Sequence, residues 1–388
     1  MTEAARSAVV IGAGVFGVTG ALALRRRGWR VTLLDSGPLP HVRASSTDLC
    51  KVVRMDYGAD DLFTDLAAEA MIGWDRWNAS WPEPLYCETG FALMAGGAMV
   101  PGSFEHESFT RMQARDVPVE RIDGDALCAR FPVWVATGLT DGYFNPRAGW
   151  AASGRVMERL IAEARAGGVA IHAGKQLGRE RGSRVVGVEM ADGESLDADI
   201  TLVAAGAWTP HLLPHLQDVM WVTGQPLVYL RPKRIADFQP PRFCCWAADI
   251  TRTGWYGFPD VGNGIVKIGN HGAGVRVHPD ELHGVPADHL DRTRSFLAES
   301  LPDLLDAEIV KARLCLYCDA WDGAFTIDHD PARPGLAVAA GGSGHGFKFA
   351  PVLGDLIADA VERRENRFLP RFRWRPRGEA VREAARAS

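Results

Sequence analysis

The chain has 388 residues, of which 47% are hydrophobic and 23% are charged, and its formal net charge at pH 7 is −5. This length suffices for two domains with sizeable cores, and the composition is that of an ordinary globular protein. The negative charge argues against a general nucleic-acid binder, and no stretch is long and apolar enough to predict a membrane span. Seven cysteines spread over the chain do not have the pattern of a disulfide framework, so we expect a reducing, cytoplasmic compartment.

A glycine-rich motif follows the first apolar stretch, Val9–Ile11. Gly12 permits a tight turn, Gly14 lets a pyrophosphate approach the backbone, and Gly17 lets a helix pack on the strand. A second strand ends at Asp35, eighteen residues beyond Gly17, where the carboxylate that binds an adenosine ribose is expected. The motif predicts a dinucleotide that contains ADP; the alternative is a glycine-rich turn without a ligand. The predicted contacts are Gly12, Gly14, Val15, Phe16, Gly17, Asp35 and Ser36.

The middle of the chain predicts two helices and a hairpin. Residues 86 to 145 alternate short strands with polar turns. Ser153 is expected to cap a helix that ends at Gly167–Gly168. The segments 184–190 and 195–197 are expected to pair around a turn at Asp192–Gly193. An earlier helix has one apolar face, which consists of Leu62, Leu66, Ala70, Trp74 and Trp77.

A buried strand from Ile200 ends in small residues, which allow close backbone approach, so we expect it to return to the nucleotide through Gly206 and Trp208. Residues 216–314 are rich in strands, interrupted by a helix over about 289–301. The stretch that begins at Arg363 carries nine arginines among Phe368, Phe372 and Trp374. We interpret it as a solvated tail whose aromatic side chains dock on the body; a nucleic-acid patch is the alternative.

A second glycine-rich turn follows the last buried strand, Leu336–Ala340. The turn, Gly341-Gly342-Ser343-Gly344-His345-Gly346, leads into a helix whose N–H groups are expected to point to one place. Two-electron reduction of a flavin puts negative charge on its pyrimidine side, and a helix N-terminus stabilises such charge. Lys348 adds a full positive charge in the first helical turn. The pattern therefore favours a flavin at this second turn.

Five motifs, in order, resemble the monomeric sarcosine oxidase family, which also includes N-methyltryptophan, pipecolate and fructosyl-amino-acid oxidases within the flavoproteins similar to D-amino-acid oxidase. The resemblance extends from about Val9 to about Arg364. GSGHGFKF, which ends at Phe349, is the most specific element. The motifs are GAGVFG, KVVRMDY (residues 51–57), KIGNH (residues 267–271), CLY (residues 315–317) and GGSGHGFKF.

The resemblance implies FAD tethered through a cysteine sulfur to the flavin 8α-methyl, and Cys315 matches that cysteine whereas Cys318 does not. A small buried thiol is the alternative reading of Cys315. Lys267 matches the family's lysine that promotes the reaction with oxygen; an edge lysine that reaches water is the alternative. His271 and Tyr317 are expected to shape the same cavity; a passive core histidine is the alternative reading of His271. The further expected cofactor contacts are Ser46, Thr47, Gly206, Trp208, Gly344, His345, Gly346, Phe347 and Lys348.

The resemblance also implies that Arg54 and Lys348 hold the carboxylate of the substrate, since an arginine fork and a lysine point charge suit that anion. Sarcosine oxidases have an arginine at the position of Lys51 and histidines near Ser46–Thr47. Lysine at position 51 is closer to the fructosyl-amino-acid and saccharopine-type oxidases. We therefore expect Lys51 to bind substrate, and the substrate to be a secondary amine larger than a small N-methyl amino acid.

The predicted fold is α/β, with a Rossmann-like FAD-binding domain built from separated segments and an inserted α+β substrate domain on an antiparallel sheet. We expect residues 1–85, 146–215 and 315–375 in the FAD-binding domain, residues 86–145 and 216–314 in the substrate domain, and residues 376–388 in a tail.

The predicted function is oxidation of a secondary amine or N-substituted amino acid to an imine, with O2 reduced to hydrogen peroxide. A flavin dehydrogenase with another electron acceptor and an NAD(P)-binding dehydrogenase are the alternatives. The expected partners are a small amine substrate and O2, with no nucleic acid, metal or membrane, and the expected state is a monomer or weak dimer.

Overall fold

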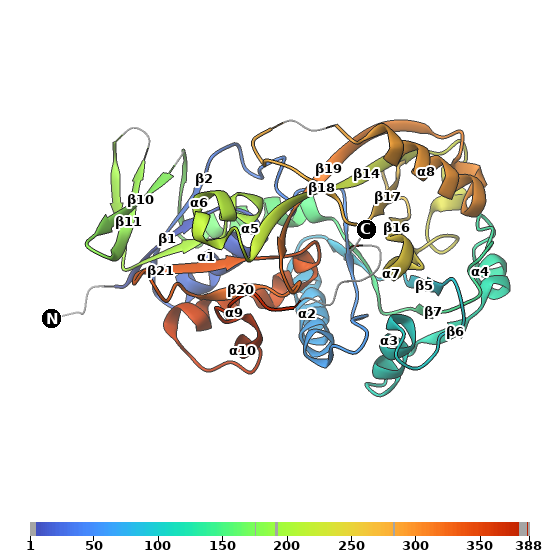
Figure 1. Cartoon of the computed structure of the whole chain (residues 1–388), viewed down its shortest axis with the longest axis horizontal. Coiled ribbons are helices and arrows are strands. Elements are labelled where there is room, and N and C mark those ends of the chain that lie inside the picture. Colours follow the sequence, from blue (N-terminus) through green and yellow to red (C-terminus); the bar gives the residue numbers. More distant parts are fainter. Residues whose placement is uncertain (1–4, 175, 191–192, 282–283, 380–385, 387–388) are drawn as a thin grey trace. The chain divides into compact units, whose positions relative to one another are not determined.

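The strand predicted before Gly12 lies inside a six-stranded sheet in the computed structural model of the chain (Figure 1). The structure describes residues 5–174, 176–190, 193–281, 284–379 and 386. The sheet belongs to unit 1, which comprises Met1–Asp48, Ser153–Val222 and Leu316–Ala380. Unit 2 comprises Leu49–Ala152, Thr223–Cys315 and Val381–Ser388.

The sheet of unit 1 has the strand order β20-β21-β13-β1-β2-β9. Neighbouring strands run parallel except for β20, which pairs antiparallel with β21. Every residue of β1 and β21 is buried, as expected for parallel strands covered on both faces. This confirms the α/β prediction. The strands are β1 (Ser7–Ile11), β2 (Arg30–Asp35), β9 (Ala170–Ala173), β13 (Ile200–Val203), β20 (Thr326–His329) and β21 (Leu336–Ala340).

Helix α1 packs against both α5 and α9. The α5 side chains Val156, Leu160, Ile161 and Ala164 are buried. The first residue of α5 does not cap the helix as expected: Ser153 Oγ donates a hydrogen bond to the carbonyl oxygen of Asp48, 3.0 Å away. The helices of unit 1 are α1 (Val15–Arg26), α5 (Ser153–Ala166), α6 (Thr209–Leu212), α9 (Ala350–Glu362) and α10 (Leu369–Phe372), with 3-10 turns η1 (Gly206–Trp208), η2 (Pro214–Leu216) and η5 (Gly346–Phe349).

The predicted hairpin is present as β11 (Arg184–Met190) and β12 (Ser195–Asp197), which pair antiparallel. A further strand, β10 (Gln176–Arg181), pairs with the other side of β11. Of the predicted turn, Asp192 lies outside the described residues and Gly193 has a φ of +89°.

Unit 2 is built on a nine-stranded sheet with the order β18-β14-β17-β16-β15-β5-β7-β6, and β19 pairs with β14. Its neighbours run antiparallel as predicted, with the exception of β15 and β5, which are parallel. The strands are β5 (Phe91–Ala95), β6 (Glu120–Ile122), β7 (Asp141–Asn145), β14 (Met220–Arg231), β15 (Cys245–Ala248), β16 (Trp255–Phe258), β17 (Val266–Asn270), β18 (Val275–Arg276) and β19 (Glu308–Ala320).

A small three-stranded sheet, β3-β8-β4, also belongs to unit 2. Because of this pairing, residues 49–85 and 146–152 group with unit 2, whereas the sequence assigned them to the FAD-binding domain. The strands are β3 (Lys51–Val53), β4 (Tyr86–Cys87) and β8 (Gly149–Ala151).

The stretch 86–145 contains two helices that the sequence analysis missed. Both begin after a capping side chain: Ser103 Oγ accepts from the N–H of His106, and the carboxylate of Asp123 accepts from the N–H of Ala126. Their sequences have no strong apolar period. The helices of unit 2 are α2 (Asp61–Ser80), α3 (Phe104–Gln113), α4 (Gly124–Arg130), α7 (Ile250–Thr253) and α8 (Ala287–Ser300), with 3-10 turns η3 (Ile235–Phe238) and η4 (Pro302–Leu304).

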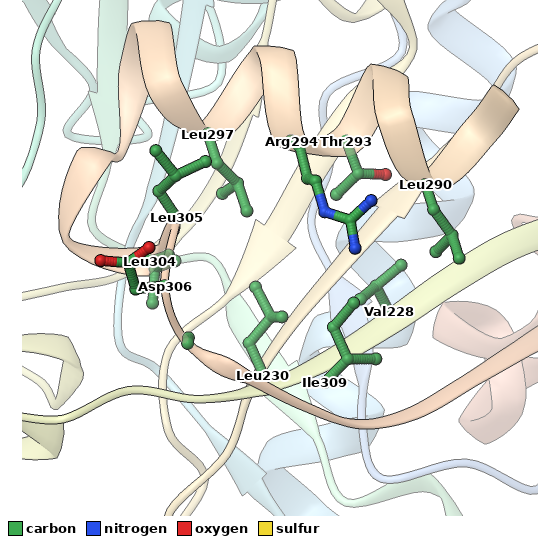
Figure 2. A pocket seen from close by; sticks show the side chains of 11 residues that line it. Val228, Leu230, Leu290, Thr293, Arg294, Leu297, Leu304, Leu305, Asp306 and Ile309 are labelled. Carbon is green, nitrogen blue, oxygen red and sulfur yellow. The ribbon is translucent and has the colours of Figure 1, made fainter. Parts of the chain in front are cut away.

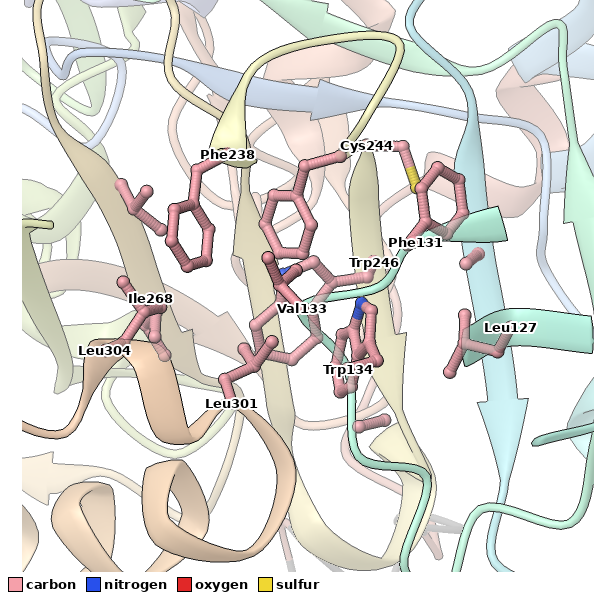
Figure 3. Close-up of a cluster of buried hydrophobic side chains, with 14 of the residues drawn as sticks. Leu127, Phe131, Val133, Trp134, Phe238, Cys244, Trp246, Ile268, Leu301 and Leu304 are labelled. Atoms are coloured by element: carbon pink, nitrogen blue, oxygen red, sulfur yellow. The ribbon is translucent and has the colours of Figure 1, made fainter. Parts of the chain in front are cut away.

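Aromatic side chains fill the main core of unit 2 (Figure 3). The rings of Trp134 and Trp246 meet edge to face with centroids 5.0 Å apart, and Phe243 stacks on Trp134. Each such ring buries a large apolar area, so this cluster holds one face of the nine-stranded sheet against η3, α8 and η4.

The aromatic side chains after Arg363 dock on unit 1, as predicted. Phe372 is fully buried, and Arg375 forms a bidentate ion pair with Asp322 at 2.7 Å. Trp374 stacks on the ring of His215. Among the described residues, no helix is both long and apolar enough to cross a membrane.

Candidate active site

The first glycine-rich turn joins β1 to α1 and lies beside the end of β13. Gly12 has a φ of +102°, and a Cβ there would lie 2.6 Å from the carbonyl oxygen of Ala204. A Cβ at Gly17 would lie 1.8 Å from the carbonyl oxygen of Gly12. Only glycine fits at either place, because the backbone cannot move aside. The strand from Ile200 therefore does return to this turn, as its small residues predicted.

The start of α1 offers its N–H groups to a ligand. No side chain caps the helix, and its first turn holds no acidic residue. Asp35 faces the turn, and its Oδ2 accepts a hydrogen bond from the N–H of Ala13 at 2.7 Å. Asp35 Oδ1 has no hydrogen-bond donor among the described residues. Ser36 is exposed, and the Oγ of buried Ser46 lies 3.4 Å from where a Cβ of Gly14 would be.

The second glycine-rich turn has fewer available N–H groups than predicted. The N–H of Ser343 donates to the carbonyl oxygen of Cys318, and those of His345 and Gly346 donate to that of Gly342. These three groups stabilise the turn itself and cannot also bind a ligand. The correction follows from the left-handed backbone at Ser343 and Gly344, which folds the turn back on itself.

Phe16 connects the two glycine-rich turns. A Cβ at Gly346 would lie 2.8 Å from Cε2 of Phe16, so the Phe16 ring lies directly against the backbone of the second turn. The same ring packs edge to face on Phe325 with centroids 5.4 Å apart. Two motifs more than 300 residues apart in sequence thus meet within unit 1.

Side chains around the second turn are packed rather than exposed. The ring of Tyr317 lies on Gly344, where a Cβ would come within 2.0 Å of it. His345 stacks on Phe325, and its Nε2 lies 2.9 Å from the carbonyl oxygen of Gly323. Phe347 and Lys348 are buried, 8% and 4% exposed. The ring of His345 is thus already in contact with two groups of unit 1.

The remaining predicted cofactor contacts of unit 1 lie in two loops. Gly206 follows β13 with a φ of +52°, and a Cβ there would meet no atom within 4 Å. Trp208 packs edge to face against His41, centroids 5.3 Å apart. The N–H of Thr47 donates to the carbonyl oxygen of Ala44.

In unit 2, the stretch Cys50–Lys51 lies between two predicted site residues. The Nζ of Lys51 is 3.6 Å from the Sγ of Cys315, within hydrogen-bonding distance for sulfur. On the preceding residue, the carbonyl oxygen of Cys50 accepts a hydrogen bond of 2.6 Å from the Nζ of Lys267. Two residues thus link the predicted flavin tether to the predicted oxygen-activating lysine.

Lys267 is not at an edge of the sheet. Its strand, β17, lies between β14 and β16, and the side chain is 1% exposed. The ammonium group lies 4.4 Å from the centre of the Phe258 ring. The alternative reading of an edge lysine that reaches water is therefore wrong. A lysine buried this deeply in a central strand is rare and is a candidate functional group.

Arg54 follows β3 and is surrounded by three rings. Its guanidinium carbon lies 5.4 Å from the ring centre of Phe91 and 5.9 Å from those of Tyr57 and Phe104. Its Nη1 donates to the carbonyl oxygen of Asp56. Burial raises the pKa of Tyr57 well above its usual value, so this ring stays neutral beside the cation.

His271 lies one residue beyond the end of β17 and is half-buried. Its N–H donates to the carbonyl oxygen of Gly254, 2.7 Å away. Its Nε2 lies 3.2 Å from Nη1 of Arg386. The sequence analysis named no partner for His271, since Arg386 is 115 residues away.

Three groups around these side chains were missed by the sequence analysis: the carbonyl oxygen of Cys50 and the side chains of Asp56 and Tyr143. Asp56 is fully buried and accepts a hydrogen bond of 2.5 Å from the hydroxyl of Tyr143. The available signal in the sequence was the acidic Asp56, which lies between the apolar pair Val52–Val53 and Tyr57. Tyr143 gave none, because only tertiary structure brings it to Asp56.

A cavity of about 330 Å³ in unit 2 lies elsewhere (Figure 2). Aliphatic side chains of α8, β14 and η4 line it, with Arg294 and Asp306 as its charged groups. It contains none of the predicted site residues. Among the residues that the structure describes, no group of three or more His, Cys, Asp or Glu side chains is arranged to hold a metal ion.

Known proteins share this sequence pattern and fold. The chain is 27% identical over 360 residues to monomeric sarcosine oxidase from Bacillus sp. (strain B-0618), with 90% of each chain covered. It is 28% identical over 379 residues to N-methyl-L-tryptophan oxidase from Salmonella arizonae, covering 94% of this chain and 97% of the relative. Fructosamine oxidase (Amadoriase II) from Aspergillus fumigatus has a TM-score of 0.82 at 25% identity, with 96% of this chain and 90% of that chain covered.

The family described as FAD dependent oxidoreductase matches residues 7–360. This range includes both glycine-rich turns, the Cys50–Lys51 stretch and Cys315. The chain therefore belongs to this family of FAD-dependent oxidoreductases.

Proposed function

We propose that this protein is an FAD-dependent oxidase of a secondary amine or N-substituted amino acid. The supporting observation is the Cys50–Lys51 stretch, which contacts both Cys315 and Lys267. When bound, FAD supplies the redox chemistry: it accepts a hydride equivalent from the carbon beside the amine and passes the electrons to O2. The resulting imine is hydrolysed by water, and hydrogen peroxide is released.

Unit 1 has the features needed to hold FAD. The uncapped start of α1 suits the diphosphate, contacted through Gly12, Gly14, Val15, Phe16 and Gly17. The free oxygen of Asp35 suits a ribose hydroxyl, because the other oxygen is already fixed by Ala13. The other expected cofactor contacts are Ser36, Ser46, Thr47, Gly206, Trp208, Gly344, His345, Gly346, Phe347 and Lys348.

Cys315 is the proposed covalent attachment point, as an 8α-S-cysteinyl link. Its sulfur is buried and has the ammonium of Lys51 beside it. A thiolate is the nucleophile in such chemistry, and a nearby cation stabilises its charge. Burial raises the pKa of the Cys318 thiol to about 12, so this thiol stays protonated and is a poor nucleophile.

Arg54 is the proposed ligand of the substrate carboxylate. Its Nη1 is committed to Asp56, whereas its Nε and Nη2 make no hydrogen bond to the described residues. These two donors form one edge of the guanidinium, which matches the two oxygens of a carboxylate. Lys348 stays a predicted second carboxylate ligand and Lys51 a predicted substrate contact.

Lys267 is the proposed group for the reaction with oxygen. Electron transfer to O2 creates an anion, and a fixed, desolvated cation lowers that barrier without reorganisation. The hydrogen bond to Cys50 holds the ammonium group in place. His271 and Tyr317 are proposed to shape the substrate cavity.

The substrate class is proposed from Lys51 and from the relatives. The relatives are named for oxidation of sarcosine, N-methyl-L-tryptophan and fructosyl amines, and these are the candidate substrate classes. Lysine at position 51 favours a substrate larger than sarcosine. We also propose a reducing, cytoplasmic compartment, since all seven cysteines are free thiols, and a monomer or weak dimer.

The test uses the purified holoprotein. We expect a yellow protein that bleaches anaerobically with one member of a panel of N-methyl, cyclic and glycated amino acids, and that releases peroxide when air is admitted. If the bleached flavin stays reduced in oxygenated buffer, the protein is a dehydrogenase with another acceptor. A colourless protein that binds NAD would overturn the flavin assignment altogether.

A further inference from the structure

Asp56 is a buried carboxylate that the reaction described above does not use. The residue is 0% exposed, two positions after Arg54. Its Oδ1 accepts a hydrogen bond of 2.5 Å from the hydroxyl of Tyr143. Its Oδ2 is buried and has no hydrogen-bond partner among the described residues. A carboxylate so deeply buried needs a counter-charge, because desolvation of an unpaired ion is costly.

The nearest cation is the guanidinium of Arg54, whose Nη1 lies 4.0 Å from Oδ2 of Asp56. The same Nη1 donates to the carbonyl oxygen of Asp56. The carboxylate and the carbonyl of one residue therefore act on the same corner of the guanidinium. The opposite edge, Nε and Nη2, has no partner among the residues that the structure describes.

Aromatic rings enclose the guanidinium of Arg54. Phe91, Tyr57 and Phe104 surround the guanidinium, and the Arg54 side chain is only 13% exposed. Water is thereby largely replaced by ring faces, which attract the cation but do not fix its rotation. Rotation is fixed only by directional contacts, and among the described residues those contacts come from Asp56.

Tyr143 holds Asp56 in turn. It lies in β7, is 0% exposed, and its ring packs against Phe109 with centroids 5.6 Å apart. Burial, followed by the charge of Asp56, raises the pKa of Tyr143 well above its ordinary value. The hydroxyl thus stays protonated and remains a donor to the carboxylate.

We propose that Asp56, held by Tyr143, is a positioning residue that presents the Nε–Nη2 edge of Arg54 to the carboxylate of the amine substrate. The inference rests on the proposed function and names residues beyond it. Asp56 acts at a distance of 4.0 Å and from the far corner, so it orients the guanidinium without occupying the edge that the substrate needs. It therefore affects binding only through Arg54.

The experiment measures binding of acetate, a minimal carboxylate, to the oxidised holoenzyme by isothermal titration calorimetry. We expect Asp56→Asn to weaken acetate binding about tenfold, since the asparagine amide would repel Nη1 and turn Arg54. Tyr143→Phe should act in the same direction to a smaller extent. In an Arg54→Lys background, Asp56→Asn should cause no further loss, because the edge that it positions is already gone.

Controls separate positioning from general stability. Asp260→Asn alters another buried carboxylate of unit 2, which accepts from the N–H groups of Gly262, Asn263 and Gly264, and should leave acetate affinity unchanged. Asp56→Glu keeps the charge and should retain most of the affinity. A crystal structure of Asp56→Asn should show a rotated Arg54. If Asp56→Asn does not fold, Tyr143→Phe is judged by the same criteria.

Two results overturn the inference, and they differ in what else they reject. If Arg54→Lys weakens acetate binding while Asp56→Asn and Tyr143→Phe stay within twofold of the unmodified protein, positioning by Asp56 is wrong and the proposed function stands. If Arg54→Lys also leaves the affinity unchanged, Arg54 does not bind the carboxylate, and that part of the proposed function fails as well.

Discussion

The amine nitrogen of Lys51 lies 3.6 Å from the sulfur of Cys315, although 264 residues separate them in the chain. Lys51 is on β3 and Cys315 on β19, and both belong to unit 2. The contact gives the predicted tether a cationic neighbour, and it connects a proposed substrate contact to the proposed attachment point.

Cys315→Ala is expected to yield protein whose flavin is released by acid precipitation, whereas the unmodified protein keeps its yellow colour in the pellet. Cys318→Ala is the matched control on the same strand. Because burial keeps the Cys318 thiol protonated, its removal should leave the colour in the pellet. Yellow supernatant from the unmodified protein would reject the covalent link.

Lys51→Gln is expected to slow covalent attachment by about tenfold, since the amide donates to sulfur but carries no charge to stabilise the thiolate. The measurement mixes apoprotein with FAD and follows acid-stable flavin over time. Lys51→Arg keeps the charge and should be closer to the unmodified protein. Equal rates for Lys51→Gln and the unmodified protein would show that the contact has no part in attachment.

Gly346→Ala is expected to destabilise unit 1 by about 1–3 kcal/mol, because the new methyl group would lie 2.8 Å from the Phe16 ring. Flavin content of the purified protein should fall with it. The double variant that combines Gly346→Ala with Phe16→Leu should recover part of the lost stability and part of the lost flavin content. Gly97→Ala, where a Cβ meets no atom within 4 Å, is the control. No loss in Gly346→Ala would mean that the two turns do not meet.

Lys267→Met is expected to slow reoxidation of the reduced flavin by oxygen at least about a hundredfold, while anaerobic reduction by substrate is changed much less. Stopped-flow absorbance separates the two half-reactions. Lys311→Met is the control, since Lys311 also lies over a ring, that of Tyr229, but is exposed. Equal slowing of both half-reactions in Lys267→Met would point to a structural role instead.

Stability is expected to fall as the pH drops from about 6.5 to about 4 because of His289. Burial, reinforced by Arg292, lowers the pKa of His289 from 6.5 to about 4. Between these pH values, His289 is protonated in the unfolded chain but neutral in the folded protein. The stabilisation that is present above pH 6.5 is therefore lost on acidification. Screening by nearby solvent limits the effect to about 1–2 kcal/mol.

Urea unfolding at pH 7 and pH 5 measures this loss in the unmodified protein and in His289→Gln. The glutamine cannot take up a proton, so the variant should lose less stability between the two pH values. The same difference in both proteins would show that other groups cause the acid sensitivity.

Much of the fold could be predicted from local patterns. Apolar runs marked β1, β13 and β21, and glycines marked the turns that follow them, because strand and turn preferences act over a few residues. The glycine pair that ends α5 was equally clear. Helices α3 and α4 were missed because their faces are weakly apolar, although Ser103 and Asp123 are capping residues that signal a helix start.

The residue types and their spacing could be predicted from the amino-acid sequence: two glycine-rich turns, a lysine within an apolar strand, and a cysteine and an arginine in recognisable stretches. The folded chain was needed to show that Lys267 is buried in a central strand, that Lys51 contacts Cys315, and that Tyr143 donates a hydrogen bond to Asp56 beside Arg54. Contacts between residues far apart in the chain depend on strand order and packing, which local sequence does not encode.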